Sequence, residues 1–195
     1  MQCRNTADTY GQVSILLHWL IAILVICMLI AGFVMEMDFM EDSDLGQTIK
    51  FYHVSTGFLI LALMCLRLAW SLIGSLPDAA KGLSPLEAKT SKSVHWLLYA
   101  LLIIMPISGY VMSASGGKEG EPLRILPFFK PEMVPNLIGR NHDLHEFGET
   151  VHLVLAWIII VVVTLHIAAA IKHHCVEKNG VLARMIPSLG NKDGG

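Results

Sequence analysis

Four long apolar stretches constrain this chain more than any other feature of its sequence. They span residues 14–35, 51–73, 93–113 and 147–171. A helix needs about 20 mostly apolar residues to cross roughly 30 Å of hydrocarbon, and in lipid the backbone is satisfied only within helices or closed barrels. Charged residues make up 15% of the chain, against about 25% in a soluble domain. We therefore expect an all-α integral membrane four-helix bundle, with one domain over residues 1–195.

Composition and motifs exclude several classes of protein. A disordered chain needs low hydrophobicity and high charge, whereas 54% of these residues are hydrophobic. The net charge of −2 gives no basic field for nucleic acid. The cysteines show no CxxC or CxxCH spacing, so we expect no disulfide framework, zinc ribbon or covalently attached haem. The sequence also lacks a GxGxxG fingerprint for a built-in NAD or flavin site.

The basic residues outside the apolar stretches predict an orientation. Eight basic residues lie on the side that holds both termini and the second connection, and five lie on the other side. The acidic residues are distributed the opposite way, with five on the first side and eleven on the second. The excess of Lys and Arg predicts that both termini are cytoplasmic, in a bacterial inner membrane. The first stretch is too long for a cleaved signal peptide. The long connection at 114–146 contains Pro122, Pro127, Pro131 and Pro135, which prevent a long helix, and should pack over the external face.

Four histidines inside the apolar stretches occur at two depths. His18 and His166 lie near the cytoplasmic ends of their stretches, whereas His53 and His152 lie near the external ends. Ionisable residues within membrane segments are costly and usually face the bundle interior. His152 and His166 are 14 residues apart, which is about 21 Å along a helix with an angular offset of roughly 40°. Both rings therefore point to one side of the fourth helix, in opposite halves of the bilayer.

Two imidazoles from different helices in an apolar surround suit a six-coordinate b-type haem. A zinc site usually needs four ligands, commonly with Cys or carboxylate, and these pairs offer two each. The alternative is four unrelated histidines that bond between helices. We expect two haem b groups, one held by His18 and His166 and the other by His53 and His152.

The chain resembles a known family, the bacterial diheme cytochromes b561 of the four-helix inner-membrane type. The motifs that carry the resemblance are LLHW (16–19), HVSTG (53–57), MPISGY (105–110), LHIAAAIKHH (165–174) and RMIP (184–187). The resemblance implies the same two haem pairs, ubiquinone as substrate or bound partner, and superoxide:ubiquinone oxidoreductase activity. Family members can carry an HE dipeptide near the external ligand, which raises His145 as an alternative; the 14-residue spacing favours His152.

Several further residues are candidates for the site. Arg67 either snorkels to the interface or pairs with a haem propionate. His95 is either an ordinary interfacial residue or a hydrogen-bond donor to a propionate or a quinone carbonyl. Lys172, His173 and His174 form a positive anchor, and the resemblance adds a quinone site there with His173 as donor.

These features predict transmembrane electron transfer from an external donor to ubiquinone. The donor is either superoxide or a small basic redox protein, and the acidic external loops suit the latter at least equally well. One alternative is a haem-bearing anchor for a periplasmic dehydrogenase or soluble cytochrome. Another is a transporter or structural membrane protein without haem. Lipid is the expected environment, a homo-oligomer is open, and no nucleic acid is expected.

Overall fold

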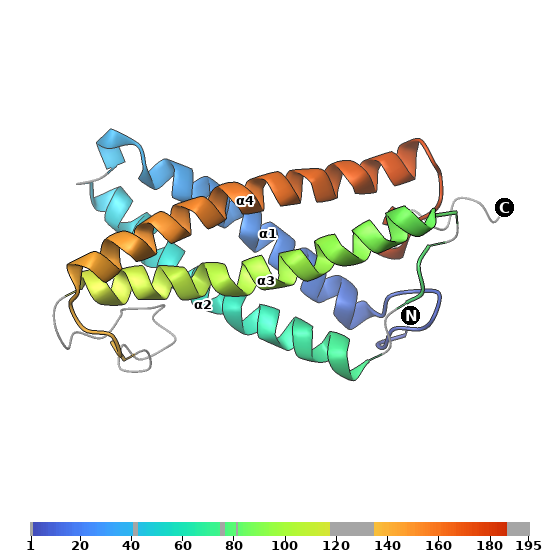
Figure 1. Cartoon of the computed structure of the whole chain (residues 1–195), viewed down its shortest axis with the longest axis horizontal. Helices are drawn as coiled ribbons and strands as arrows, with labels where there is room; N and C mark the ends of the chain where they lie inside the picture. The colour runs from blue at the N-terminus through green and yellow to red at the C-terminus, as the bar shows by residue number, and fades with distance from the viewer. Residues whose placement is uncertain (1, 41–42, 75–76, 81, 118–134, 187–195) are drawn as a thin grey trace.

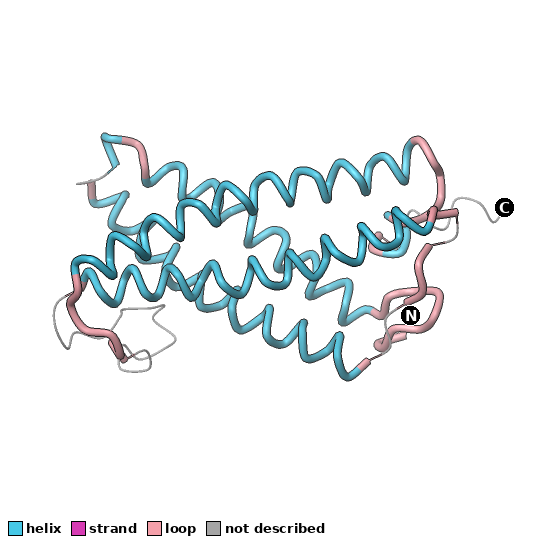
Figure 2. The backbone as a smooth tube through the Cα atoms, in the orientation of Figure 1, coloured by secondary structure: helices cyan, strands magenta, loops and turns pink. Residues whose placement is uncertain are grey.

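The computed structural model describes residues 2–40, 43–74, 77–80, 82–117 and 135–186, and no strand occurs in these ranges. Four long helices form a bundle (Figures 1 and 2): α1 Gln12–Met35, α2 Asp44–Ile73, α3 Pro85–Gly116 and α4 His142–Cys175. Two short 3-10 helices, η1 Asp38–Met40 and η3 Leu182–Arg184, follow α1 and α4. Each long helix is apolar and long enough to cross a membrane. The expected all-α four-helix architecture is confirmed.

The helices are longer than the apolar stretches that predicted them, because polar caps lie beyond those stretches. The Ser43 side chain accepts a hydrogen bond from the Gly46 amide, so α2 begins at Asp44 rather than at 51. Ser84 and Glu87 form a capping box with Pro85 at the first turn of α3. Asn141 caps α4 through the Leu144 amide. The long connection is consequently shorter than the predicted 114–146 and runs over 117–141.

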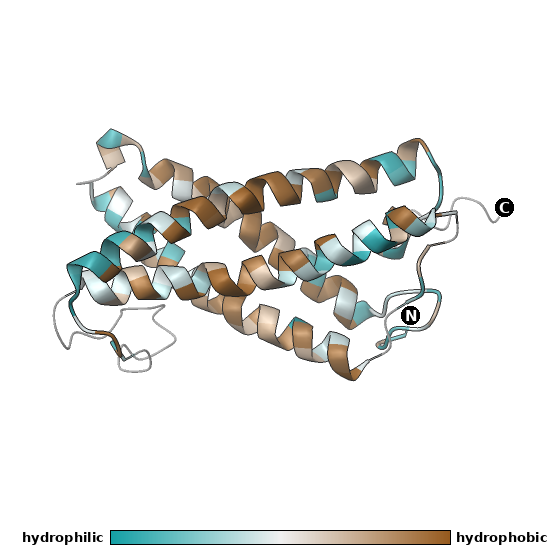
Figure 3. Ribbon diagram, in the orientation of Figure 1, coloured by the Kyte–Doolittle hydropathy of each residue, from teal (hydrophilic) through white to brown (hydrophobic). Residues whose placement is uncertain are grey.

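The small core lies at the middle of the bundle and takes residues from every long helix. Its buried members are Ile21, Val25, Ile60, Met64, Leu101 and Ile159. Large apolar side chains also cover the outside of the same helices; Ile23, Ile30 and Val161 are each more than half exposed. The central part of each helix is largely hydrophobic, and hydrophilic residues lie toward both ends of α4 (Figure 3). Apolar surface on the outside is what a lipid environment requires of a spanning bundle.

The N-terminal segment, the α2–α3 connection and η3 lie at one end of the bundle (Figure 1), which we call the terminal end. The Asp78 amide donates to the Ala7 carbonyl, and the Arg184 guanidinium donates to the Asp78 carbonyl. The Trp19 indole donates to the Met185 carbonyl. The sequence analysis expected these three segments on one side, and they are.

The opposite end, which we call the loop end, carries η1 and residues 135–141. The Tyr110 hydroxyl donates to the Pro135 carbonyl and accepts from the Leu137 amide, which holds the chain against α3 before α4 begins. The Asn136 side chain donates to the Ala114 carbonyl. This part of the long connection packs on the helix end, as expected. The other prolines named above, Pro122, Pro127 and Pro131, lie outside the described residues.

Candidate functional site

The four histidines of the sequence analysis meet in two pairs. His53 of α2 faces His152 of α4, with ring centroids 6.2 Å apart and planes at 68°. His18 of α1 faces His166 of α4, with ring centroids 6.3 Å apart and planes at 70°. Each pair therefore joins α4 to a different helix. The 14 residues between His152 and His166 separate the pairs by about 21 Å along α4, with the first pair toward the loop end and the second toward the terminal end.

The spacing within each pair fits two imidazoles bound to opposite sides of one metal ion. A metal–imidazole nitrogen bond is about 2.0 Å long, and the ring centroid lies roughly 1.1 Å behind that nitrogen, so two such rings have centroids about 6.2 Å apart. The measured 6.2 and 6.3 Å agree with this value. Rings on a common axis can rotate about it, so the 68° and 70° planes are compatible as well. The centroid spacing of both pairs accordingly fits two imidazoles bound to one haem iron.

A second observation supports this fit at the loop-end pair. The Nδ1 atom of His53 is buried and has no hydrogen-bond partner among the described residues. Glycines line the two rings: a Cβ at position 109 would lie 3.0 Å from His152 Cε1, and one at position 32 would lie 4.0 Å from His53 Cε1. The missing side chain at Gly109 therefore lets the His152 ring lie directly against α3.

Arg67 and His95 gather around the terminal-end pair. The Arg67 Nη1 atom lies 3.0 Å from His18 Nδ1, and Nε donates to the Tyr99 hydroxyl at 3.3 Å. The guanidinium also lies over the Tyr99 ring, 5.7 Å from its centroid. The His95 ring is 5.4 Å from that of His166. Arg67 therefore points into the bundle, so it does not snorkel to the interface.

Two side chains that contact the candidate site residues were not identified from the sequence. Tyr99 holds Arg67, and Ser108 contacts His152 at 3.0 Å. Tyr99 follows His95 by four residues, which places both on one face of a helix, and Ser108 lies within the MPISGY motif. Tyr99 shares a helix face with the candidate His95, which is a signal that could have raised it, whereas no sequence signal links Ser108 to His152.

His145 makes a different kind of contact. Its Nδ1 hydrogen-bonds the Met112 carbonyl at 2.8 Å, and its ring packs against Gly116 near the end of α3. The neighbouring His142 lies 3.4 Å from Glu146 on the exposed surface. His145 thus sits in the α3–α4 contact, two turns before His152.

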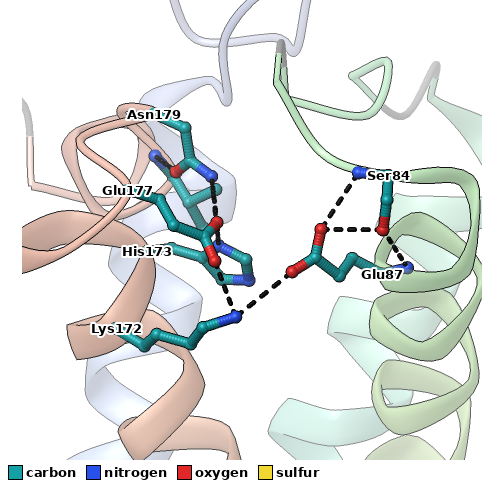
Figure 4. A network of polar contacts seen from close by, with 7 residues as sticks. Ser84, Glu87, Lys172, His173, Glu177 and Asn179 are labelled. Carbon is teal, nitrogen blue, oxygen red and sulfur yellow. Dashed lines mark hydrogen bonds and ion pairs between the residues drawn. The ribbon is translucent and has the colours of Figure 1, made fainter.

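A polar cluster joins the end of α4 to the start of α3 at the terminal end (Figure 4). Lys172 bonds Glu177 at 2.6 Å and Glu87 at 3.2 Å. The His173 Nδ1 lies 2.6 Å from Glu177 and 3.0 Å from the Asn179 amide nitrogen. The hydrogen bond from Lys172 lowers the pKa of Glu177.

Glu87, His173 and Glu177 are close enough to share a metal ion. The ammonium group of Lys172 already bonds both carboxylates and supplies the cation that they need. The cluster therefore brings the predicted residues Lys172 and His173 together through Glu177.

Comparisons with known proteins agree with this architecture. The sequence profile of a family described as prokaryotic cytochrome b561 matches residues 9–188. Cytochrome b561 homolog 2 of Escherichia coli K12 is 31% identical over 186 residues, which cover 95% of each chain. The probable superoxide oxidase CybB of Yersinia pestis is 30% identical over 178 residues, covering 91% of this chain and 96% of that one. Cytochrome b561 homolog 1 of E. coli is 24% identical, with 92% and 98% covered.

Proposed function

This chain belongs to the prokaryotic cytochrome b561 family, and from that premise we propose that it transfers electrons across the bacterial inner membrane between two b-type haems. His18 and His166 hold the haem at the terminal end, and His53 and His152 hold the haem at the loop end. The positive-inside pattern makes the terminal end cytoplasmic. All of residues 1–195 form one functional domain.

The observation that carries this proposal is the equal spacing of two histidine pairs at two depths. The centroid distances of 6.2 and 6.3 Å suit one metal ion between each pair of rings. One pair alone would suit a single-haem protein. Two pairs separated by about 21 Å along α4 support an electron path that covers both halves of the bilayer.

When bound, haem b supplies reversible one-electron transfer. The chain's own contribution begins with the two imidazole pairs, His18 with His166 and His53 with His152, which would hold the haems. Arg67, held by Tyr99, places a positive charge beside the terminal-end pair and is the proposed partner of a haem propionate. The apolar core between the pairs keeps water away from this path.

We propose ubiquinone as the membrane-soluble acceptor, bound at the terminal end beside His95. Reduction of one quinone to quinol takes two electrons and two protons, so an ionisable donor is needed. His173 suits that role, because an imidazole ring can both donate and accept a proton and its Nδ1 lies 2.6 Å from the Glu177 carboxylate. Lys172 anchors Glu177 and so keeps the carboxylate charged and in place.

The proposed external donor is superoxide. Two superoxide anions would each give one electron and leave as O₂, which matches the two electrons that one quinone takes. One relative, 30% identical to this chain, is named a probable superoxide oxidase. On this proposal the protein is an oxidoreductase that reduces quinone.

A second candidate function is a haem-bearing anchor that receives electrons from a periplasmic dehydrogenase or a small basic redox protein. The negative charge of the loop end favours this second function, since a positive surface would be needed to attract the superoxide anion. The described residues of this end include two bases, Lys50 and Arg140, and six acids: Glu36, Asp38, Asp44, Asp143, Glu146 and Glu149. Lys118, Arg124 and Lys130 lie outside the described residues.

Two measurements test these proposals. Pyridine haemochrome analysis of purified protein should give two haems per chain. His18→Ala or His166→Ala should remove one haem and His53→Ala or His152→Ala the other, while His145→Ala serves as the control and retains both. A colourless preparation, or loss of a haem in His145→Ala alone, contradicts the assignment.

Stopped-flow mixing with superoxide and a soluble quinone analogue then separates the two candidate functions. The superoxide proposal expects rapid haem reduction followed by quinol formation, with slower quinol formation in His173→Ala. An anchor subunit would turn over neither compound and would instead accept electrons from a basic cytochrome in a salt-dependent reaction.

A further inference from the structure

We propose that Ser108 is a positioning residue for His152, fixing which ring nitrogen faces the metal and lowering the midpoint potential of the loop-end haem. This inference rests on the proposed function, in which His53 and His152 are axial ligands. It concerns a side chain of α3 that contacts the ligand rather than the haem. Its basis is a hydrogen-bond chain of three groups: His152, Ser108 and the Met105 carbonyl.

The direction of this chain follows from the chemistry of its groups. The Ser108 Oγ atom lies 2.7 Å from the Met105 carbonyl oxygen and 3.0 Å from His152 Nδ1. A serine hydroxyl has one hydrogen, and a carbonyl oxygen can only accept. Ser108 therefore donates to Met105, and its oxygen lone pair accepts from the Nδ1–H of His152. The neutral ring then carries its free lone pair on Nε2, the nitrogen left for a metal.

Burial makes the contact effective. Ser108 is 7% exposed, so water does not compete for its hydroxyl. The next residue is Gly109, where a Cβ would lie 3.0 Å from His152 Cε1 and 3.3 Å from Nδ1. The missing side chain lets the ring approach α3 closely enough to reach Ser108. The consecutive residues Ser108 and Gly109 thus supply the hydrogen bond and the space for it.

The partner ligand has no such support. His53 Nδ1 is buried without a hydrogen-bond partner in the described part of the chain. A metal-bound imidazole that donates its other N–H becomes a stronger electron donor, and loss of that partner typically costs 10- to 100-fold in metal affinity or activity. Stronger donation favours the oxidised metal. Ser108 therefore acts on the donor strength of this pair through His152.

The test is a redox titration of the purified full-length holoprotein, followed by the absorbance of its two haems. Ser108→Ala should raise the midpoint potential of the haem that His53→Ala removes. We expect up to about a tenfold change in its oxidised-to-reduced ratio at fixed ambient potential, which is 59 mV for one electron. The other haem should not shift. Ser108→Thr, which keeps the hydroxyl, should restore the original value.

Ser115→Ala is the matched control. Ser115 is also a buried serine of α3, 1% exposed, but its hydroxyl bonds the Val111 and Met112 carbonyls. Removal of the Ser115 hydroxyl should leave the midpoint potentials of both haems unchanged. Selective loss of the loop-end haem in Ser108→Ala, with both haems kept in Ser108→Thr and Ser115→Ala, also supports the proposal.

Three results would overturn it: unchanged potentials in Ser108→Ala with both haems bound, a shift in the haem that His18→Ala removes, or an equal shift in Ser115→Ala. Failure of the proposed function looks different, because the unmodified protein would then lack two haems. A wild type with two haems and a silent Ser108→Ala variant refutes this inference alone.

Discussion

Replacement of Gly109 by alanine tests whether the loop-end ligand is held as tightly as the structure indicates. The new Cβ would lie 3.0 Å from His152 Cε1, whereas carbon atoms pack best at about 3.5–4.0 Å. The ring must therefore retreat by roughly 0.5 Å. Ser108, the preceding residue of α3, holds the same ring at 3.0 Å, so retreat of the ring from α3 stretches that hydrogen bond and would weaken the hold of His152 on the haem.

Overpacking of this kind typically costs 1–3 kcal/mol, which converts to roughly 5- to 150-fold weaker binding of the loop-end haem. Alanine also favours a helix over glycine by about 1 kcal/mol, so the bundle itself should remain folded. The matched control is Gly57→Ala, where the nearest atom to the new Cβ is Met28 Cε at an ordinary 4.0 Å. That variant should keep both haems.

The assay is the haem-to-protein ratio after purification, together with the rate at which haem passes to an excess of apomyoglobin. Gly109→Ala should release one of its two haems faster than wild type, and Gly57→Ala should match wild type. If Gly109→Ala releases both haems at the wild-type rates, the ring has room to move and the close fit at His152 is wrong.

Three smaller predictions concern the terminal end. Ser84→Ala removes the N-cap of α3 and should destabilise the bundle by about 1 kcal/mol, measured by thermal unfolding in detergent; an unchanged transition would show that lipid-facing packing alone fixes this helix start. The Lys172 hydrogen bond lowers the pKa of Glu177, so Glu177 stabilises the fold above the ordinary carboxyl pKa and loses that effect as pH falls through its own lower pKa. Wild type should therefore melt above Glu177→Gln at neutral pH, the two should converge in acid, and a pH-independent gap would contradict the ion pair. Arg67→Gln should lower the midpoint potential of the haem that His18→Ala removes, because a positive charge nearby stabilises the reduced form; an unchanged potential would mean that Arg67 acts only through packing.

The spans and the depths of the histidines could be predicted from the sequence because each depends on position along the helix. Hydropathy marks the length that crosses hydrocarbon, and the 14-residue spacing on α4 aligns His152 with His166. The helix ends could not be predicted in this way. Ser84 and Asn141 cap their helices outside the apolar window, where hydropathy carries no information.

The contacts that Ser108, Tyr99 and Arg67 make could not be predicted from the sequence for another reason. In a soluble bundle the apolar face of a helix indicates which side turns inward. Here outward residues such as Ile104 and Ile107, each more than 40% exposed, are as apolar as the buried Leu101. Hydropathy therefore does not indicate how α3 is rotated about its axis. Without that rotation, the contact between Ser108 and His152 cannot be predicted. Histidines reveal their face only because burial of an imidazole in lipid is costly.

The two ends of the bundle differ in a way that predicts the direction of electron flow. In the described part of the chain, His53 and His152 contact each other and uncharged groups, and the Ser108 hydroxyl would make His152 a stronger donor. At the terminal end the Arg67 guanidinium lies 3.0 Å from His18. The first arrangement lowers the midpoint potential of the loop-end haem and the second raises that of the terminal-end haem. Both differences favour electron movement from the loop end to the terminal end, where quinone is proposed to bind. Redox titration of His18→Ala and His53→Ala, each retaining one haem, assigns the two potentials; a higher potential at the loop end would reverse the preferred direction and leave superoxide as a poor candidate for the physiological donor.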